Sequence, residues 1–441
     1  MLKRLDSDVD AVAGGSAQLF WAKIAGNAGF FVAVLILARA LGPSGRGTIA
    51  FVTVTALVAA RVAGLGIEEA TSVFVARRPE ARGALLTNVV TFVSGSAVLA
   101  ATAVCAGLLL LGDRAPAGLG GPEIAAIAAA TLVFALSDAG HCFILGCGQF
   151  GRVAAVTATT SWLYPLFLFL VWSTVGLTVA RAALAWVVAE SVRAFAYLGQ
   201  ALRGVELRRP DAHLLLEAVR FGTRAWAGSL ARFLNFRTDQ LLLGFLASEA
   251  ALGVYAVAVN ASEVLLYLPA ATATALLPVA ARTEPGRRAD QALRAFRGAA
   301  VVTGAGALIA ALAGPLLLPL VFGAAFEPSV VPFLWLLPGA VGFAAIAVFS
   351  NALVGASAPG HSSLGPLVAL VLGVALDLVL IPRFGASGAA AAASAAFLAG
   401  GWVALIAFRR RTPFPWRLLL HPQRADLTMF RALARPLGAS R

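Results

Sequence analysis

Charged residues are scarce in this sequence. Asp, Glu, Lys and Arg make up 12% of the 441 residues, whereas hydrophobic residues make up 60%, and the mean hydropathy is +0.87. A soluble globular domain usually carries about 25% charged residues. The composition therefore excludes a soluble protein and indicates an integral membrane protein.

Several chemical signatures are also missing. The three cysteines, Cys105, Cys142 and Cys147, fall inside predicted helices and show neither a disulfide framework nor a metal-ligand spacing. There is no phosphate-binding loop of the GxxxxGK(S/T) type, so we expect no ATP hydrolysis by this chain. The stretch "MLKRLDSDVD" is acidic and lacks a small-residue cleavage site, so we do not expect a removable signal peptide. We expect no enzyme activity, no metal and no organic cofactor.

Long apolar runs dominate what is present. A helix needs roughly 20 residues to cross the hydrocarbon core, and lipid satisfies no backbone polar group, so such runs must be helical. Twelve runs are long enough; they lie near residues 16–40, 47–67, 84–111, 123–147, 153–174, 179–202, 219–246, 251–280, 293–320, 329–354, 363–382 and 387–408. The sequence thus predicts an all-α integral membrane protein with about twelve transmembrane helices.

The excess of basic residues predicts the orientation in the bilayer. The formal net charge is +13, and arginine gathers in every second loop and in the tail 409–441, as expected if those segments face the cytoplasm. We therefore predict a multi-pass protein of the plasma membrane with both termini cytoplasmic. Orientation accounts for the positive charge, so nucleic-acid binding is not needed to explain it. The cytoplasmic loop arginines are Arg77, Arg78, Arg82, Arg203, Arg208, Arg209, Arg282, Arg287 and Arg288.

Two pairs of matching loops predict an internal repeat. "ALGPSGRGTIAF" (40–51) joins the first two spans and "FLASEAALGVYAVA" (245–258) joins the seventh and eighth, while "VARRPEARG" and "AARTEPGRR" follow the second and eighth. Parallel repeats of this kind sandwich a central site in many transporters. We predict two six-helix bundles around a central cavity. The predicted parts are a cytoplasmic N-terminus (1–15), an N-terminal lobe (16–202), a cytoplasmic linker (203–218), a C-terminal lobe (219–408) and a basic cytoplasmic tail (409–441).

These segments carry a family resemblance. "ILARALGPSGRGTIAF", "NFRTDQLLLGFLASEAALGVYAVAVNASEVLLYLPAATATALLPVAAR", "LLLPLVFGAAFEPSVVPFLWLLPG" and "NALVGASAPGHSSLGPLVALVLGVALDLVLIPRFGASGAAAAAS" resemble the polysaccharide flippase branch of the multidrug/oligosaccharidyl-lipid/polysaccharide (MOP) exporter superfamily. The likeness covers essentially all twelve spans. One departure is Asp377, where family members often have asparagine.

The resemblance implies a fold and a substrate. It implies two six-helix lobes whose cavity opens alternately to either side. It also implies export of polyprenyl-pyrophosphate-linked oligosaccharide from the inner to the outer leaflet for cell-surface polysaccharide assembly. The implied partners are this lipid-linked oligosaccharide and membrane lipids, with a polysaccharide polymerase or glycosyltransferases as further candidates.

Cations inside the spans are the candidate substrate-binding residues. A charge at mid-membrane is costly unless it faces water or a partner, and a guanidinium binds phosphate oxygens two at a time. We expect Arg232, Asn235 and Asp239 to share one face of the seventh helix, with Arg237 pointing elsewhere and not paired with Asp239. The alternative is that these cations snorkel to an interface or neutralise acids. The predicted substrate-binding residues are Lys23, Asn27, Arg61, Arg232, Asn235 and Arg237.

Carboxylates inside the spans are candidates for coupling transport to H⁺ or Na⁺. Asp138 and His141 are three residues apart on one predicted helix, a spacing that permits a shared proton. The alternative for each acid is pairing with a nearby cation. We also expect Glu68 and Glu69 to contact Arg77 or Arg78. The predicted ion-coupling residues are Asp138, His141, Asp239, Glu263 and Asp377.

Three other functions remain open at this stage. A lipid-linked peptidoglycan precursor flippase would share a cationic cavity. A drug or organic-cation antiporter would need carboxylates and aromatic rings in the cavity, whereas the first, second and seventh spans offer arginine and lysine. A membrane glycosyltransferase or polymerase would need long catalytic loops on the outer face; the longest here is "GDRAPAGLGGPE".

Overall fold

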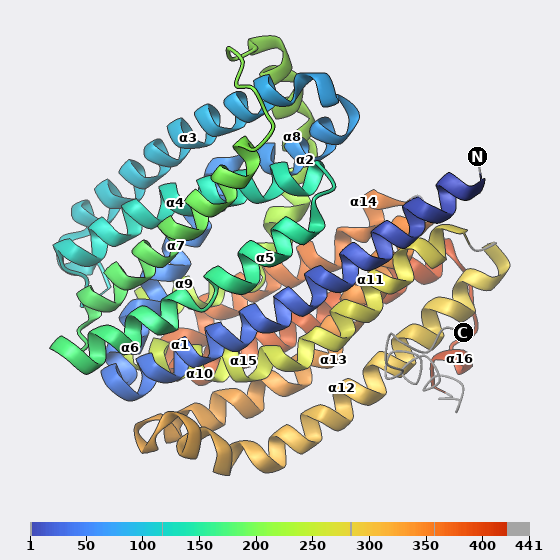
Figure 1. Ribbon diagram of the computed structural model, residues 1–441. Helices are drawn as coiled ribbons and strands as arrows, with labels where there is room; N and C mark the ends of the chain where they lie inside the picture. The colour runs from blue at the N-terminus through green and yellow to red at the C-terminus, as the bar shows by residue number, and fades with distance from the viewer. Residues whose placement is uncertain (1, 117, 283–284, 357, 421–441) are drawn as a thin grey trace. The chain divides into compact units, whose positions relative to one another are not determined.

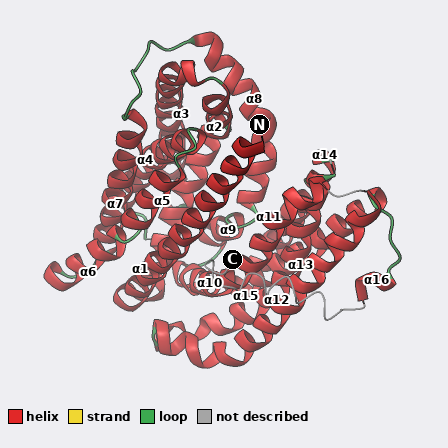
Figure 2. Ribbon diagram, turned by 45° about the vertical axis from the view of Figure 1, so that its right-hand side comes forward, coloured by secondary structure: helices red, strands yellow, loops and turns green. Residues whose placement is uncertain are grey.

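The protein is helical throughout the described residues. The computed structural model describes residues 2–116, 118–282, 285–356 and 358–420, and these form helices and loops without a strand (Figure 2). The helices are α1 (Leu2–Gly64), α2 (Ile67–Arg77), α3 (Arg82–Leu111), α4 (Gly121–Gly146), α5 (Phe150–Thr160), α6 (Leu163–Val175), α7 (Val179–Leu202), α8 (Ala212–Leu234), α9 (Thr238–Leu246), α10 (Glu249–Ser262), α11 (Tyr267–Arg282), α12 (Pro285–Phe322), α13 (Val330–Gly355), α14 (Pro359–Ser362), α15 (Leu364–Arg411) and α16 (Arg417–Leu420).

Nine helical segments of the described chain are long and apolar enough to cross a membrane. Two of them, Gln18–Gly64 and Gly360–Arg411, each hold two predicted spans. They bend at glycines with positive φ, Gly42 (65°) in α1 and Gly385 (54°) in α15, a conformation that glycine adopts without a Cβ penalty. The protein is therefore a multi-pass membrane protein.

The seventh predicted span, 219–246, is not one apolar helix, and this prediction was wrong. The chain forms α8 and α9, separated by a break at residues 235–237. The last turn of α8 carries Arg232, and α9 has only nine residues. Two other predicted spans are also interrupted: 153–174 divides into α5 and α6, and 251–280 divides into α10, a 3₁₀ turn (Glu263–Leu266) and α11.

The chain packs into two compact units. Unit 1 comprises Met1–Leu230 and Ser248–Gly253, and unit 2 comprises Ala231–Ala247 and Val254–Arg441. Unit 1 thus extends beyond the predicted linker 203–218, because the first half of α8 buries Leu214 and Ala218 in the same core as Phe74 of α2.

The core of unit 1 lies among α1, α2, α3, α4, α5, α7 and α8. Figure 1 shows α3, α4 and α7 running side by side. Phe143 and Ile144 of α4 are almost fully buried against Leu85 and Leu86 of α3. The linker is fixed to this unit, since the Asn88 side chain donates to the backbone oxygen of Asp211 and accepts from its N–H, at 2.9 and 3.0 Å.

The two matched loop segments meet within unit 1. A Cβ on Gly47 would lie 1.9 Å from the Glu249 carbonyl oxygen, and a Cβ on Gly253 would lie 1.9 Å from the Pro43 carbonyl oxygen. Gly47 lies four residues after Pro43, and Gly253 lies four residues after Glu249. This reciprocal contact is what two equivalent segments related by a local two-fold axis would give.

Small residues allow close helix packing in unit 2. A Cβ on Gly342 of α13 would lie 2.5 Å from backbone atoms of Phe397 and Leu398 in α15, and Gly339 approaches Ser394 in the same way. Helix pairs in lipid depend on such small residues because van der Waals contact drives their association. Unit 2 has a hydrophobic core that includes Phe349 and Phe408 and lies near the C-terminal ends of α13 and α15.

We expect Gly342→Ala to lower the thermal stability of the purified protein by the equivalent of about 1–3 kcal/mol, because the added methyl overpacks a backbone contact. Gly304→Ala in α12 is the control, since a Cβ there would meet no atom of the described chain within 4 Å. Melting temperatures in detergent check this. Equal melting temperatures for the two variants would contradict the packing described.

Candidate functional site

Unit 1 contains a cluster of three charges around Arg61. Arg61 ends the second half of α1, Glu69 lies in the first turn of α2, and Asp138 lies in α4. The guanidinium is 3.4 Å from an Asp138 carboxylate oxygen and 3.7 Å from one of Glu69. All three side chains are partly exposed, at 30%, 29% and 38% for Arg61, Asp138 and Glu69. The cluster is therefore paired and still reachable.

Three ring side chains and a buried acid border this cluster. The Trp226 indole N–H donates to the Arg61 carbonyl oxygen at 3.1 Å, which holds the end of α1 against α8. The His141 ring lies against the Tyr197 ring, with centroids 5.4 Å apart. Glu68 is buried, and its carboxylate lies against the backbone of Gly64.

Two predictions about these residues were wrong. Glu68 and Glu69 do not pair with Arg77 or Arg78: Glu69 pairs with Arg61, and Arg78 forms a bidentate ion pair with Glu217 at 2.8 Å. The reason is that α2 turns the Glu69 side chain back toward the end of α1.

The expected pairing of Asp138 with His141 is also not seen. Asp138 faces Arg61, and no hydrogen bond joins it to His141 among the described residues. The His141 ring lies against the Tyr197 ring instead.

Burial raises the pKa of the Glu68 carboxyl to about 8, and the nearby Asp138 carboxylate adds to this shift. Glu68 lies in α2, after the apolar segment that ends at Gly64. At neutral pH its carboxyl is therefore mostly protonated. The cluster then carries one positive charge, on Arg61, and two negative charges, on Asp138 and Glu69.

Another ion pair of unit 1, between Arg193 and Glu190, was not predicted. Arg193 of α7 lies 2.9 Å from a Glu190 oxygen and donates to the Thr160 hydroxyl at 3.1 Å. The available sequence signal was the i,i+3 spacing of Glu190 and Arg193 on one helix.

Lys23 and Asn27 lie on the first half of α1. Lys23 is exposed and Asn27 is half-buried. Neither makes a hydrogen bond or an ion pair with another described residue. Both side chains are thus available to a ligand.

In unit 2 the functional residues surround the break between α8 and α9. The Asn235 amide donates to the carbonyl oxygens of Ala231 and Pro366 at 2.9 and 2.8 Å. The backbone N–H groups of Phe236 and Arg237 bond three residues back instead of four. These bonds end α8 and tie the break to α15.

This break overturns the expected shared face of Arg232, Asn235 and Asp239. Arg232 lies in the last turn of α8, Asn235 lies in the break, and Asp239 lies in the first turn of α9. The three residues belong to different local structures, so helical spacing does not relate them. Arg232 is exposed and makes no ion pair among the described residues.

Partners fix three of the other charged residues of unit 2. Arg237 caps α9 and its guanidinium lies 3.1 Å from Glu263. Asp239 accepts hydrogen bonds from the Gln240 backbone N–H at 2.7 Å and from the buried Tyr255 hydroxyl. Arg237 and Glu263 thus neutralise each other, which matches the pairing alternative for Glu263.

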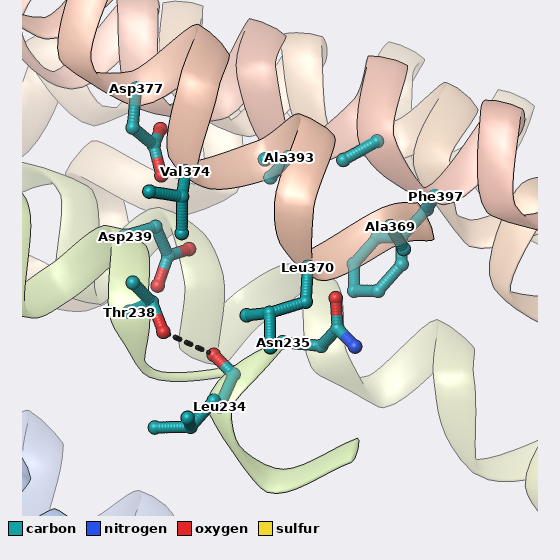
Figure 3. Close-up of a pocket in the computed structure, with 12 residues that line it drawn as sticks. Leu234, Asn235, Thr238, Asp239, Ala369, Leu370, Val374, Asp377, Ala393 and Phe397 are labelled. Atoms are coloured by element: carbon teal, nitrogen blue, oxygen red, sulfur yellow. Dashed lines mark hydrogen bonds between the residues drawn. The ribbon is translucent and has the colours of Figure 1, made fainter. Parts of the chain in front are cut away.

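A pocket in unit 2 brings Asp239 and Asp377 together. Its cavity volume of about 20 Å³ exceeds the about 10–15 Å³ that one water molecule requires. Figure 3 shows both carboxylates beside Val374, with Asn235 at the other end of the pocket. One Asp377 oxygen, Oδ1, is buried without a hydrogen-bond partner among the described residues. The other lining residues are Leu234, Thr238, Ala369, Leu370, Gly373, Ala393, Ala396 and Phe397.

Comparisons with known proteins agree with this architecture. The model of the family described as "polysaccharide biosynthesis protein" matches residues 13–284. Among curated proteins, none matches the chain.

Solved structures show similarity of fold. A structure of the lipid II flippase MurJ in an inward closed conformation superposes with a TM-score of 0.72 at 12% identity, covering 95% of this chain and 92% of that one. An inward-facing multidrug resistance MATE family transporter of the MOP superfamily gives 0.67 at 17%, covering 88% and 94%. A mutant of the Vibrio cholerae MATE transporter VcmN gives 0.53 at 15%, covering 93% and 100%. The chain therefore has the all-α fold of MOP transporters.

We expect Glu68→Gln to flatten the pH dependence of stability. The folded-state pKa of about 8 lies above the ordinary 4.5, so the folded protein binds more protons than the unfolded one between these values. Stability then falls as pH rises through that window. Glutamine does not titrate and so removes this loss. The melting temperature of the variant, relative to that of wild type, should therefore be highest above pH 8. Melting temperatures from pH 5 to 9 check this; parallel curves for both proteins would contradict the assigned pKa.

Proposed function

The chain belongs to the family of polysaccharide biosynthesis proteins, and we propose that it flips polyprenyl-pyrophosphate-linked oligosaccharide from the inner to the outer leaflet. Membership, the MOP fold and the membrane-spanning helices make it a membrane flippase or transporter. The proposal adds the substrate, the direction, and the use in cell-surface polysaccharide assembly.

The observation that carries the substrate class is a set of reachable cations, two in the membrane-spanning α1 and one in the last turn of α8. Arg61 is partly exposed, Arg232 is exposed without an ion-pair partner in the described chain, and Lys23 is exposed. Cations in a bilayer are costly unless they face water or an anion. A lipid-linked pyrophosphate supplies that anion, and its isoprenoid chain stays in lipid.

The structure narrows the predicted binding set. Arg237 is engaged with Glu263, and the Asn235 amide is engaged with two carbonyl oxygens. We assign these two residues to holding the break between α8 and α9. Lys23, Asn27, Arg61 and Arg232 remain the proposed ligands of the pyrophosphate-sugar headgroup.

We assign the coupling ion, H⁺ or Na⁺, to the pocket of Asp239 and Asp377. Among the acids predicted for this role, Asp138 and Glu263 are neutralised by arginines, whereas neither Asp239 nor Asp377 has a cation within ion-pair distance in the described chain. Two carboxylates that share a small cavity favour binding of a cation or proton.

The cellular setting follows from this substrate. Lipid-linked oligosaccharides are turned outward across the plasma membrane, with the basic loops and both termini on the cytoplasmic side. The protein moves the substrate without chemical change, so we propose no enzyme activity.

In cells that lack this chain, and any redundant exporter, we expect the lipid-linked oligosaccharide to remain inward-facing. Wild type should restore outward-facing carrier, and Arg232→Ala should restore it at least about tenfold more slowly, because it loses a charge-assisted contact to phosphate. Arg224→Ala, an exposed arginine of the same helix, is the matched control and should behave as wild type. An impermeant sugar-modifying reagent reports the sidedness.

Normal outward-facing carrier in the absence of the protein would contradict the flippase proposal. Accumulation of inward-facing peptidoglycan precursor, with oligosaccharide carrier unaffected, would favour the second candidate, a lipid-linked peptidoglycan precursor flippase. The substrate of that second candidate also carries a pyrophosphate, and the similarity of fold to the lipid II flippase MurJ supports it.

Ion coupling predicts a distinct phenotype for Asp377→Asn. In proteoliposomes, an imposed H⁺ or Na⁺ gradient should accelerate transport by wild type and leave this variant's rate unchanged, because the variant loses one of the two ion-binding carboxylates. Asp377→Glu should keep part of the response. Equal acceleration of wild type and Asp377→Asn would contradict the assignment of the ion to this pocket.

A further inference from the structure

The ion pairs of Arg61 are looser than the other arginine–carboxylate pairs of the described chain. Charge-assisted N–H···O contacts are shortest, about 2.7–2.9 Å, when they are fully formed. The shortest N···O separations are 2.8 Å for Arg78–Glu217, 2.9 Å for Arg193–Glu190, 3.1 Å for Arg237–Glu263, 3.4 Å for Arg61–Asp138 and 3.7 Å for Arg61–Glu69. Arg61 thus divides its charge between two acids and forms a tight pair with neither.

The same three side chains are the accessible ones of this region. About a third of each is exposed, whereas only 6% of the Glu190 side chain is. A partner from outside the protein can therefore reach the Arg61 guanidinium. The backbone of Arg61 is held independently through the Trp226 indole, so a change of partner leaves the end of α1 in place.

The charge of the cluster opposes the binding of an additional anion. Glu68 is buried and mostly neutral, so Asp138 and Glu69 outweigh Arg61 by one negative charge. A pyrophosphate that approached Arg61 with both carboxylates in place would meet like charges at a few ångströms, where repulsion is substantial in a low dielectric. Phosphate binding at Arg61 requires that at least one carboxylate withdraw.

We propose that Asp138 and Glu69 are exchangeable counter-ions of Arg61, which hold its guanidinium in the empty carrier and give way to phosphate oxygens of the substrate. This inference rests on the proposed function and deepens it. The two carboxylates weaken substrate binding, and they do so at the site where the headgroup must later be released.

The arrangement solves a problem of transport across lipid. A guanidinium stays charged at every accessible pH, so an empty carrier with a bare Arg61 would change conformation with an unpaired charge in the membrane region. A guanidinium binds carboxylate and phosphate through the same planar set of donors. Exchange between the two keeps Arg61 paired through the whole cycle.

Binding of pyrophosphate to the purified full chain in lipid nanodiscs tests this. Isothermal titration with inorganic pyrophosphate should show about three- to tenfold tighter binding for Asp138→Asn and Glu69→Gln than for wild type, as expected for removal of a partly exposed competing charge. Arg61→Gln should bind at least about tenfold more weakly. Glu217→Gln, which removes a carboxylate from a pair elsewhere in unit 1, is the matched control and should bind as wild type. Melting temperatures verify that each variant is folded.

The outcomes separate the inference from the proposed function. Weaker binding by folded Asp138→Asn would show that Asp138 holds Arg61 in its binding position, and would overturn the inference while the function stands. Equally tighter binding by Glu217→Gln would show that the effect comes only from the change in net charge of the protein. That result would also overturn the inference. A titration with farnesyl pyrophosphate should follow the same order of variants. Absence of binding of either probe to every variant would contradict the proposed phosphate-binding site itself, and with it the inference.

Discussion

The cost of an unpaired charge in a lipid environment shapes the polar interior of this protein. Three arginines of the membrane region, Arg61, Arg193 and Arg237, each face a carboxylate at 2.9–3.4 Å. The pairs lie between α1 and α4, within α7, and between the start of α9 and the 3₁₀ turn after α10. Distance and the burial of the acid distinguish these pairs, because the Glu190 side chain is only 6% exposed in the tight pair with Arg193, whereas Asp138 and Glu69 are partly exposed in the looser pairs with Arg61.

The two units use their polar residues differently. In unit 1 Arg61 is paired with Asp138 and Glu69, and the proposed exchange of these counter-ions opens the guanidinium to an anionic headgroup. In unit 2 the pocket beside α9 holds two acids, with the nearby arginine occupied by Glu263, which suits a cation or a proton.

Much of the fold followed from the sequence. Apolar runs predicted most of the helices, and they separated the spans near residues 40–47 and 382–387, where the chain bends at Gly42 and Gly385. The break at residues 235–237 was missed, since it depends on hydrogen bonds from Asn235 to the distant Pro366.

The candidate site was harder to predict than the fold. The partners of Arg61 were missed because Asp138 lies on a different helix, far along the chain, and helical spacing carries no information across that separation. Local spacing did argue against a pair between Arg237 and Asp239, and Arg237 pairs with Glu263 instead. Spacing within one helix failed for Asp138 and His141 and for the expected face of Arg232, Asn235 and Asp239. Contacts between helices depend on how the helices pack.

The central claim is that the chain moves a pyrophosphate-linked lipid across a bilayer with Arg61 as a ligand. The most direct measurement reconstitutes the purified protein in liposomes with a labelled polyprenyl-pyrophosphate oligosaccharide and follows the fraction open to an impermeant sugar-modifying reagent. We predict that wild type exchanges the lipid between leaflets faster than empty liposomes do, and that Arg61→Gln approaches the empty rate. Exchange at the empty rate by folded wild-type protein, with and without an ion gradient, would contradict the account.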